Sequence, residues 1–203
     1  MAIIDSMQRL RELIGTPNEL VRLKIHSSLN ETARLFIERS PMLLLATSGE
    51  DGRPQVSPKG DAAGFVRVAD DHTLLIPERK GNKLAFTLEN ILKNPKVALI
   101  FLVPGTCETL RIEGRAALDD DAALCQQLSA RGSPALLVTR VKVNAVYFHC
   151  AKAFLRAELW LPETWREAIA VSFGKEIAQD GGLEQDKVAE FDAAVHSRYK
   201  TDL

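Results

Sequence analysis

The chain has 203 residues, of which 46% are hydrophobic and 26% charged, and its formal net charge is -1. These values fit one globular domain with appendages, and they give no global field that would favour nucleic acid or an anionic membrane. No stretch approaches the roughly 18 uninterrupted apolar residues of a membrane helix. Charges from Asp5 to Glu12 also interrupt the N-terminal segment too early for a signal peptide. We therefore expect a cytoplasmic protein that binds neither nucleic acid nor membrane.

The chain has three cysteines, Cys107, Cys125 and Cys150. They are few, odd in number and far apart in sequence. This pattern argues against a disulfide framework and against a zinc site. We expect three reduced thiols and no bound metal.

The first forty residues predict two helices. Apolar residues recur at nearly helical spacing across residues 3–14. The tetrapeptide Ser28-Leu29-Asn30-Glu31 matches a capping box, so a second helix is expected to begin near Ser28. It should end before Pro41, because the residue before a proline disfavours helical geometry.

Short strands with tight turns dominate the middle of the chain, and the first two, separated by a Gly-Glu-Asp-Gly turn, predict a hairpin. The expected strands cover residues 42–47, 53–58, 65–68, 73–76, 96–103, 109–118 and 138–148, the last with Val141, Val143, Ala145 and Tyr147 on one face. Helices are expected over residues 83–92, from residue 119 to about residue 132, over 162–173 and over 184–199. Many short strands with few crossover helices favour an antiparallel barrel over a parallel sheet.

One candidate binding residue is Lys59, which ends the second expected strand in the sequence Ser57-Pro58-Lys59. The glycine that follows would let the backbone approach a ligand closely. A solvated lysine at a strand end is the competing interpretation.

A second candidate is the cation cluster of Arg79, Lys80 and Lys83, which includes Asn82 and precedes the helix expected over residues 83–92. A helix N-terminus offers free N–H groups and a positive dipole end, so this cluster could hold a phosphate. A charged surface loop is the competing interpretation. The segment lacks the glycine patterns of P-loop and dinucleotide-binding sites.

Two aromatic segments near the end of the last expected strand are also candidates. The first, residues 147–154, contains His149 and Lys152; His149 is either a structural residue or a ligand contact. The second contains Trp160 and Trp165, for which core or interface packing is the simpler role.

Together these segments resemble one known family. They are LLLATSGEDGRPQVSPKGD (43–61), LLIPERKGNKLAFTLENILKNPKVALIFLVPG (74–105), ETLRIEGRA (108–116), YFHCAKAF (147–154) and LWLPETW (159–165). The chain is similar to the pyridoxamine 5'-phosphate oxidase-like, FMN-binding split-barrel superfamily, and in particular to its bacterial branch of flavin-nucleotide-binding proteins.

The resemblance implies a mainly β fold with flanking helices, an FMN-binding split β-barrel. Residues 1–203 would form one domain, with an N-terminal helical segment (1–40), the barrel (42–160) and C-terminal helices (162–203). It also implies a homodimer that binds two FMN molecules at the subunit interface. The cofactor-binding residues would be Ser57, Pro58, Lys59, Arg79, Lys80, Asn82, Lys83, His149 and Lys152.

The resemblance does not extend to the substrate. The chain ends in SRYKTDL, with no counterpart of the Trp…Arg-x-His substrate segment of the oxidase itself. We therefore expect an FMN-dependent oxidoreductase with another small-molecule substrate, possible turnover with a nicotinamide electron donor, and no assignable catalytic residue. The alternatives are a flavin-nucleotide-binding protein without turnover, or a haem or deazaflavin binder on the same fold.

Overall fold

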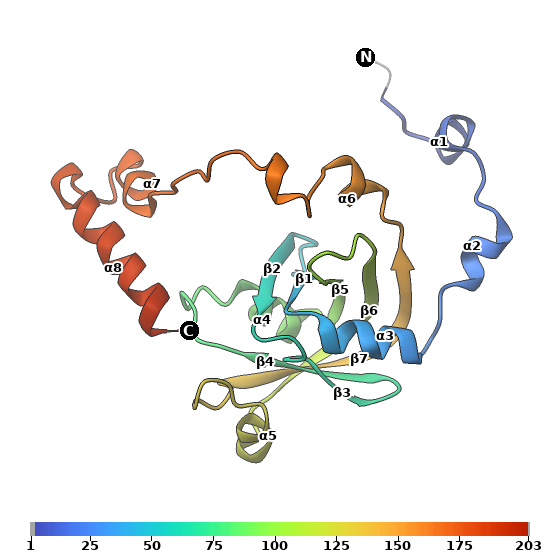
Figure 1. Ribbon diagram of the computed structural model, residues 1–203, viewed down its shortest axis with the longest axis horizontal. Helices are drawn as coiled ribbons and strands as arrows, with labels where there is room; N and C mark the ends of the chain where they lie inside the picture. The colour runs from blue at the N-terminus through green and yellow to red at the C-terminus, as the bar shows by residue number, and fades with distance from the viewer. Residues whose placement is uncertain (1–2, 203) are drawn as a thin grey trace.

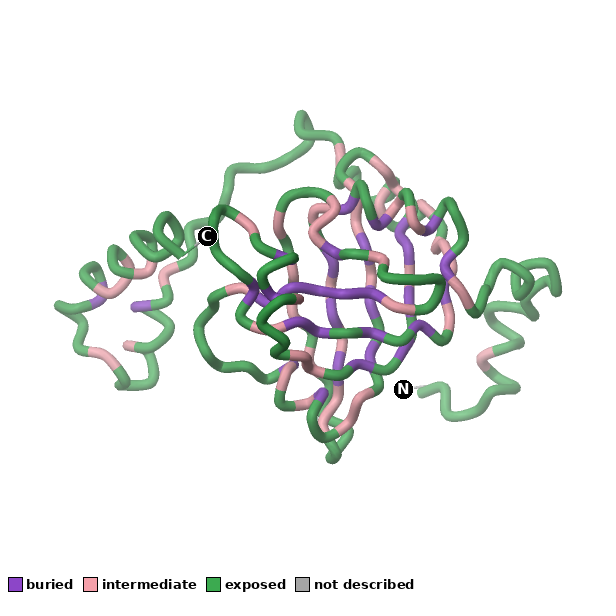
Figure 2. The backbone as a smooth tube through the Cα atoms, turned by 90° about the horizontal axis from the view of Figure 1, so that it is seen from below, coloured by how far each residue is buried: buried purple, intermediate pink, exposed green. Residues whose placement is uncertain are grey.

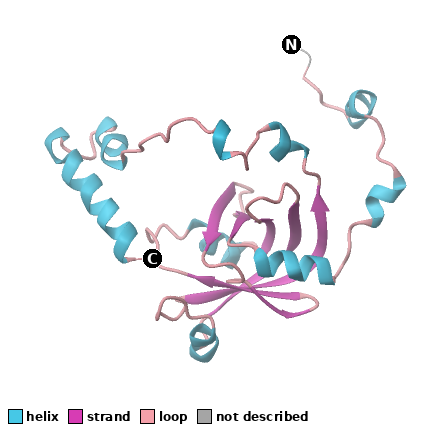
Figure 3. Ribbon diagram, in the orientation of Figure 1, coloured by secondary structure: helices cyan, strands magenta, loops and turns pink. Residues whose placement is uncertain are grey.

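The computed structural model describes residues 3–202, and within them seven β-strands form one sheet flanked by helices (Figures 1 and 3). The strands are β1 (Met42–Ser48), β2 (Pro54–Gly60), β3 (Arg67–Asp70), β4 (Thr73–Glu78), β5 (Lys96–Leu102), β6 (Thr109–Asp119) and β7 (Leu137–His149). The α-helices are α1 (Met7–Ile14), α2 (Glu19–Leu23), α3 (Glu31–Arg39), α4 (Phe86–Lys93), α5 (Ala122–Gln127), α6 (Lys152–Arg156), α7 (Phe173–Gln179) and α8 (Val188–Thr201). Two 3-10 turns are η1 (Pro162–Thr164) and η2 (Gln185–Lys187).

The sheet has the strand order β2-β1-β5-β6-β7-β4-β3, and each neighbouring pair is antiparallel. It curls so that β3 and β4 lie below the upright strands β1, β2, β5 and β6 and run across them (Figure 1). This arrangement confirms the expected mainly β fold with flanking helices and the split barrel.

The barrel encloses one main hydrophobic core, seen as the buried strand segments of Figure 2. Leu43, Phe101 and Ile112 are fully buried there. They come from the neighbouring strands β1, β5 and β6. Helix α3 covers one side of this core with Ile37. Its Phe36 also meets Phe148 of β7 edge to face, with ring centroids 5.4 Å apart.

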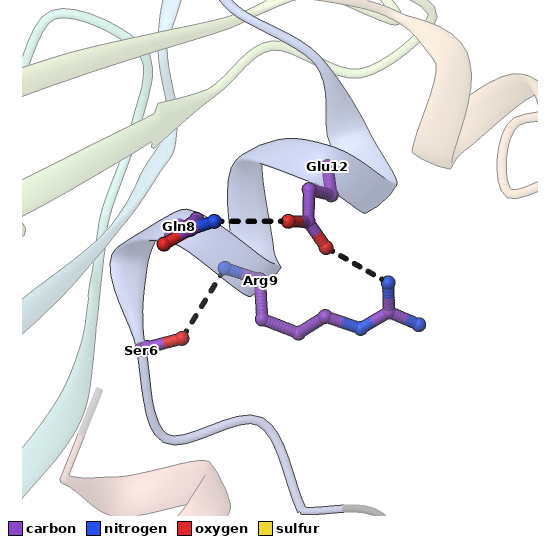
Figure 4. A network of polar contacts seen from close by, with 4 residues as sticks. All are labelled: Ser6, Gln8, Arg9 and Glu12. Carbon is purple, nitrogen blue, oxygen red and sulfur yellow. Dashed lines mark hydrogen bonds and ion pairs between the residues drawn. The ribbon is translucent and has the colours of Figure 1, made fainter.

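Both ends of the chain extend away from the barrel as helical arms (Figures 1 and 2). No residue of α1 or α2 is buried, and α1 is held by its own side chains. Ser6 accepts a hydrogen bond from the N–H of Arg9 at 3.2 Å, and Arg9 pairs with Glu12 at 3.0 Å (Figure 4). None of the helices in residues 3–202 combines the length and the apolar character that a membrane span requires.

Several predicted helix boundaries are wrong. Helix α3 begins at Glu31 rather than near Ser28, because the side chain of Asn30 accepts the capping hydrogen bond from Ala33 N–H at 2.9 Å. The expected helix over residues 162–173 is only the 3-10 turn η1. The chain beyond it is exposed, with Ile169 at 88% exposure, so no packing supports a helix there.

The predicted common face of β7 is also wrong. Its pairing with β6 shifts register at a bulge near residue 144. Before the bulge the inward residues are odd-numbered, such as Val141 and Val143, whereas Val146 is the buried residue after it. A bulge inserts one residue and so reverses the alternation. Ala145 and Tyr147 are therefore only partly buried.

The helix expected over residues 83–92 begins later, at Phe86. Lys83 and Ala85 have φ angles of 64° and 51°, in the left-handed region, so the backbone turns before the helix starts. Lys83 consequently lies in the loop between β4 and α4 with Arg79 and Lys80, rather than at the first position of the helix.

Candidate functional site

The polar residues singled out in the middle of the chain meet at one cavity of about 510 Å³. One wall is residues 55–60 of β2, and the other is residues 77–88, from the end of β4 through the loop into α4; Leu136 completes it. This volume is within the range of small-molecule sites. The predicted residues that line it are Ser57, Pro58, Lys59, Arg79, Lys80, Asn82 and Lys83.

Lys59 is held inside the cavity wall by a buried carboxylate. Its ammonium forms an ion pair with Oε2 of Glu78, and the two side chains are only 14% and 7% exposed. The hydroxyl of Thr139, on β7, donates to Oε1 of Glu78 at 2.8 Å. Lys59 is therefore not the free solvated cation of the competing interpretation. Its charge is balanced within the wall.

Arg79 is anchored by a second carboxylate, Asp61, whose side chain is 4% exposed. Arg79 Nε donates to Oδ2 of Asp61 at 3.0 Å, and Arg131 approaches Oδ1 at 3.5 Å. Within residues 3–202, the Nη1 atom of Arg79 is buried and has no hydrogen-bond partner. Because a buried donor without a partner is costly, the guanidinium of Arg79 has hydrogen-bonding capacity that the described chain does not satisfy.

Both ion pairs cross the gap between β2 and β4. In one pair the cation comes from the β2 side, and in the other it comes from the β4 side. Strand β2 is at one edge of the sheet and β4 is next to the other edge, so no ladder joins them. Lys59 and Asp61 lie on or just after β2, while Glu78 and Arg79 lie on or just after β4. Ion pairs therefore link the two walls of the cavity where backbone hydrogen bonds do not.

Between Arg79 and α4, the loop presents two further cations to the cavity. The side chain of Asn82 accepts a hydrogen bond from Leu84 N–H at 3.1 Å, which shapes the turn. Lys80 and Lys83 line the cavity, and in the described chain neither forms an ion pair. This side of the cavity is therefore cationic.

His149 and Lys152 do not line this cavity. His149 ends β7 and follows the bulge, so it shares the outward face with Tyr147, and Lys152 begins α6 on the exposed side. Burial lowers the pKa of His149 from its ordinary value, and the nearby charges of Arg111 and Lys24 lower it further. A lowered pKa favours the neutral form of this imidazole.

Sequence reasoning missed both anchoring carboxylates, Asp61 and Glu78, and the hydroxyl of Thr139. The sequence signal for the carboxylates was that each lies next to a cation of the site. Asp61 is two residues from Lys59, and Glu78 directly precedes Arg79. Thr139 carries no such signal, because it reaches Glu78 from a strand 61 residues away in sequence.

The cysteines and tryptophans lie outside the cavity lining. All three cysteines are free thiols, as expected. Trp160 is fixed within its own chain, where its indole N–H donates to the carbonyl of Thr106 at 2.9 Å. Trp165 is 59% exposed.

The fold is a split barrel, with a cavity between β2 and the segment that follows β4. The family model for pyridoxamine 5'-phosphate oxidase matches residues 29–150, more than half of the chain. The chain therefore belongs to the pyridoxamine 5'-phosphate oxidase family. The match runs from just before α3 to just after β7, so it includes both walls of the cavity and leaves out both arms.

Several solved structures are similar to the chain. A candidate pyridoxamine 5'-phosphate oxidase from Lactobacillus delbrueckii is 28% identical, with 60% of this chain and 95% of that chain covered and a TM-score of 0.47. HupZ of Group A Streptococcus is 19% identical, with 59% and 93% covered and a TM-score of 0.49. An FMN-binding protein from Syntrophomonas wolfei is 10% identical, with 71% and 97% covered and a TM-score of 0.45. A comparison with curated proteins found no match.

Proposed function

We propose that the protein is an FMN-dependent oxidoreductase of the cytoplasm that acts on a small molecule, with the cavity between β2 and β4 as its flavin site. The observation that carries this proposal is the buried, unpartnered Nη1 of Arg79 at a cavity that Lys80 and Lys83 also line. The phosphate of FMN is a dianion with three acceptor oxygens, so it fits this donor set. Family membership supports the same cofactor.

The cavity divides into two functional parts. Arg79, Lys80 and Lys83 would hold the phosphate through charge-assisted hydrogen bonds, and Asn82 would keep their loop in shape. Lys59 would lie toward the flavin ring, where Glu78 fixes its ammonium. When bound, FMN supplies hydride or electron transfer, and the chain contributes binding, orientation and the charge around the ring.

The first test is the absorption spectrum of the purified protein, followed by titration with FMN and with riboflavin. We expect a flavin spectrum and a clear preference for FMN, since only FMN carries the phosphate. Arg79→Ala should lower FMN affinity about ten- to a hundredfold, corresponding to one strong charge-assisted contact, and should leave riboflavin affinity unchanged. A colourless protein that cannot be reconstituted with FMN would overturn the proposal.

The same spectrum separates the other ligands that this fold could hold. A Soret band would identify haem, and a deazaflavin absorbs at shorter wavelength than FMN. If FMN binds tightly but the protein oxidises neither NADH nor NADPH, and no substrate reduces the flavin, the protein is a flavin-binding module without turnover.

We further propose a homodimer that places flavin at the subunit interface. The outward face of β1, β2 and β5 supports this, because Leu44, Pro58 and Ile100 align across it by register and form an apolar strip. The C-terminal arm adds exposed apolar side chains, including Trp165 and Ile169. A second subunit could also bring His149 and Lys152 to the flavin. Sedimentation of the FMN-bound protein as a monomer at micromolar concentration would contradict this.

A further inference from the structure

We infer that Asp61 is a positioning residue that aims the guanidinium of Arg79 at the phosphate of the bound ligand. This inference rests on the proposed function, because it takes the cavity as an FMN site. Asp61 does not line the cavity and would not touch the ligand. Its effect on binding would pass through Arg79.

Asp61 is itself held firmly. It directly follows β2, and its backbone N–H donates to the carbonyl of Pro41 at 3.1 Å. Its Oδ1 accepts from the N–H of Ala62 at 2.9 Å, which leaves Oδ2 for Arg79. With a side chain 4% exposed, this carboxylate has little freedom to move. It therefore provides a rigid anchor.

The contact uses only part of the guanidinium. Asp61 accepts from Nε of Arg79, and no acceptor within the described chain meets the buried Nη1. A guanidinium is planar, so fixing Nε restricts the direction of the other two nitrogens. The carboxylate thus selects one orientation of Arg79, and within the described chain it leaves both terminal nitrogens of the guanidinium without a hydrogen-bond partner.

Charge alone predicts the opposite effect. A carboxylate behind a phosphate site repels the phosphate, so neutralising it should strengthen FMN binding if Asp61 acts only through its charge. If Asp61 acts by positioning Arg79, neutralising it should weaken FMN binding. The sign of the change in affinity therefore separates the two roles.

The experiment compares FMN and riboflavin affinities, measured by quenching of flavin fluorescence, for the full-length wild type, Asp61→Asn and Arg131→Gln. Asparagine keeps the shape of the side chain and removes its charge. We expect Asp61→Asn to weaken FMN binding about three- to tenfold, part of the value of the strong contact it orients, with riboflavin affinity unchanged. Arg131→Gln is the matched control. Arg131 is 56% exposed and contacts the same carboxylate at 3.5 Å, so its removal should change neither affinity appreciably.

A double-mutant cycle completes the test. In an Arg79→Ala background, Asp61→Asn should cause no further loss of FMN affinity, because the residue it positions is absent. An equal loss in both backgrounds would overturn the inference. So would an unchanged or increased FMN affinity in Asp61→Asn alone, or a parallel loss of riboflavin binding, which would show a structural role. If the wild type binds FMN and riboflavin equally, the proposed function itself fails, and the inference falls with it.

Discussion

The ion pair of Lys59 and Glu78 gives the sharpest prediction about stability. The two side chains are 14% and 7% exposed, so removing one partner leaves a nearly buried charge without compensation. Such a loss costs about 3 kcal/mol, at the lower end for buried pairs. We therefore expect Glu78→Gln and Lys59→Met each to lower the free energy of unfolding by about 3 kcal/mol. For a chain of this size that corresponds to a fall in Tm of roughly 6–12 °C.

The double variant should cost well below the sum of the two single losses, because two neutral side chains replace two opposite charges. We expect Lys59→Met with Glu78→Gln to cost no more than either single variant, a coupling energy of about 3 kcal/mol. Urea denaturation of the ligand-free protein measures all four corners of the cycle. Glutamine can still accept from Thr139, so the cycle isolates the charge pair.

A surface pair in the same molecule is the control for this cycle. Arg140 and Asp119 form an ion pair at 2.8 Å with side chains 44% and 26% exposed. Its coupling energy should be below about 1 kcal/mol because solvent screens both charges. Equal, small coupling energies for the two pairs would show that water reaches Lys59 and Glu78, and would refute the view of a buried pair.

Three further expectations follow from the same contacts. Glu78→Gln should make the flavin easier to reduce, because it removes a negative charge near the ring; an unchanged midpoint potential would place the ring elsewhere. Burial and the charges of Arg111 and Lys24 lower the pKa of His149 in the folded protein. At pH values just below the ordinary histidine pKa of about 6.5, the unfolded state therefore binds more protons than the folded state. Stability should therefore rise with pH through that window, and His149→Gln should flatten the rise in urea denaturation. Trp165→Ala should weaken dimerisation in sedimentation experiments without changing Tm at low protein concentration; a fully dimeric variant would contradict the proposed role of the arm.

The strands and the fold class could be predicted because their signals are local. A strand alternates every second residue, and a Gly-Glu-Asp-Gly turn sets the first hairpin, so β1 and β2 lie within a few residues of their expected positions. Helix boundaries were less predictable where two capping residues compete, as Ser28 and Asn30 do. The bulge near residue 144 could not be predicted, because it depends on how β6 pairs with β7.

The cations that line the cavity could be picked out from the sequence, whereas their ion-pair partners could not. Arg79, Lys80 and Lys83 are close in sequence, so a local pattern reveals them. Asp61 and Glu78 acquire their roles only when β2 and β4 face each other across the barrel. These two strands are not hydrogen-bonded to each other. A prediction of strand pairing from the sequence therefore cannot show that they lie close together.

The position of the cavity follows from the way the barrel closes. Where strands are hydrogen-bonded, buried apolar side chains form the core inside the curled sheet. Between β2 and β4 the sheet has a gap, and polar side chains rather than backbone ladders link the two sides. A gap of this kind can be both stable and open, because the carboxylates Asp61 and Glu78 anchor the cations from behind. The ion pairs that link the two sides of this gap thus also fix the positions of Lys59 and Arg79, two of the cations of the proposed FMN site.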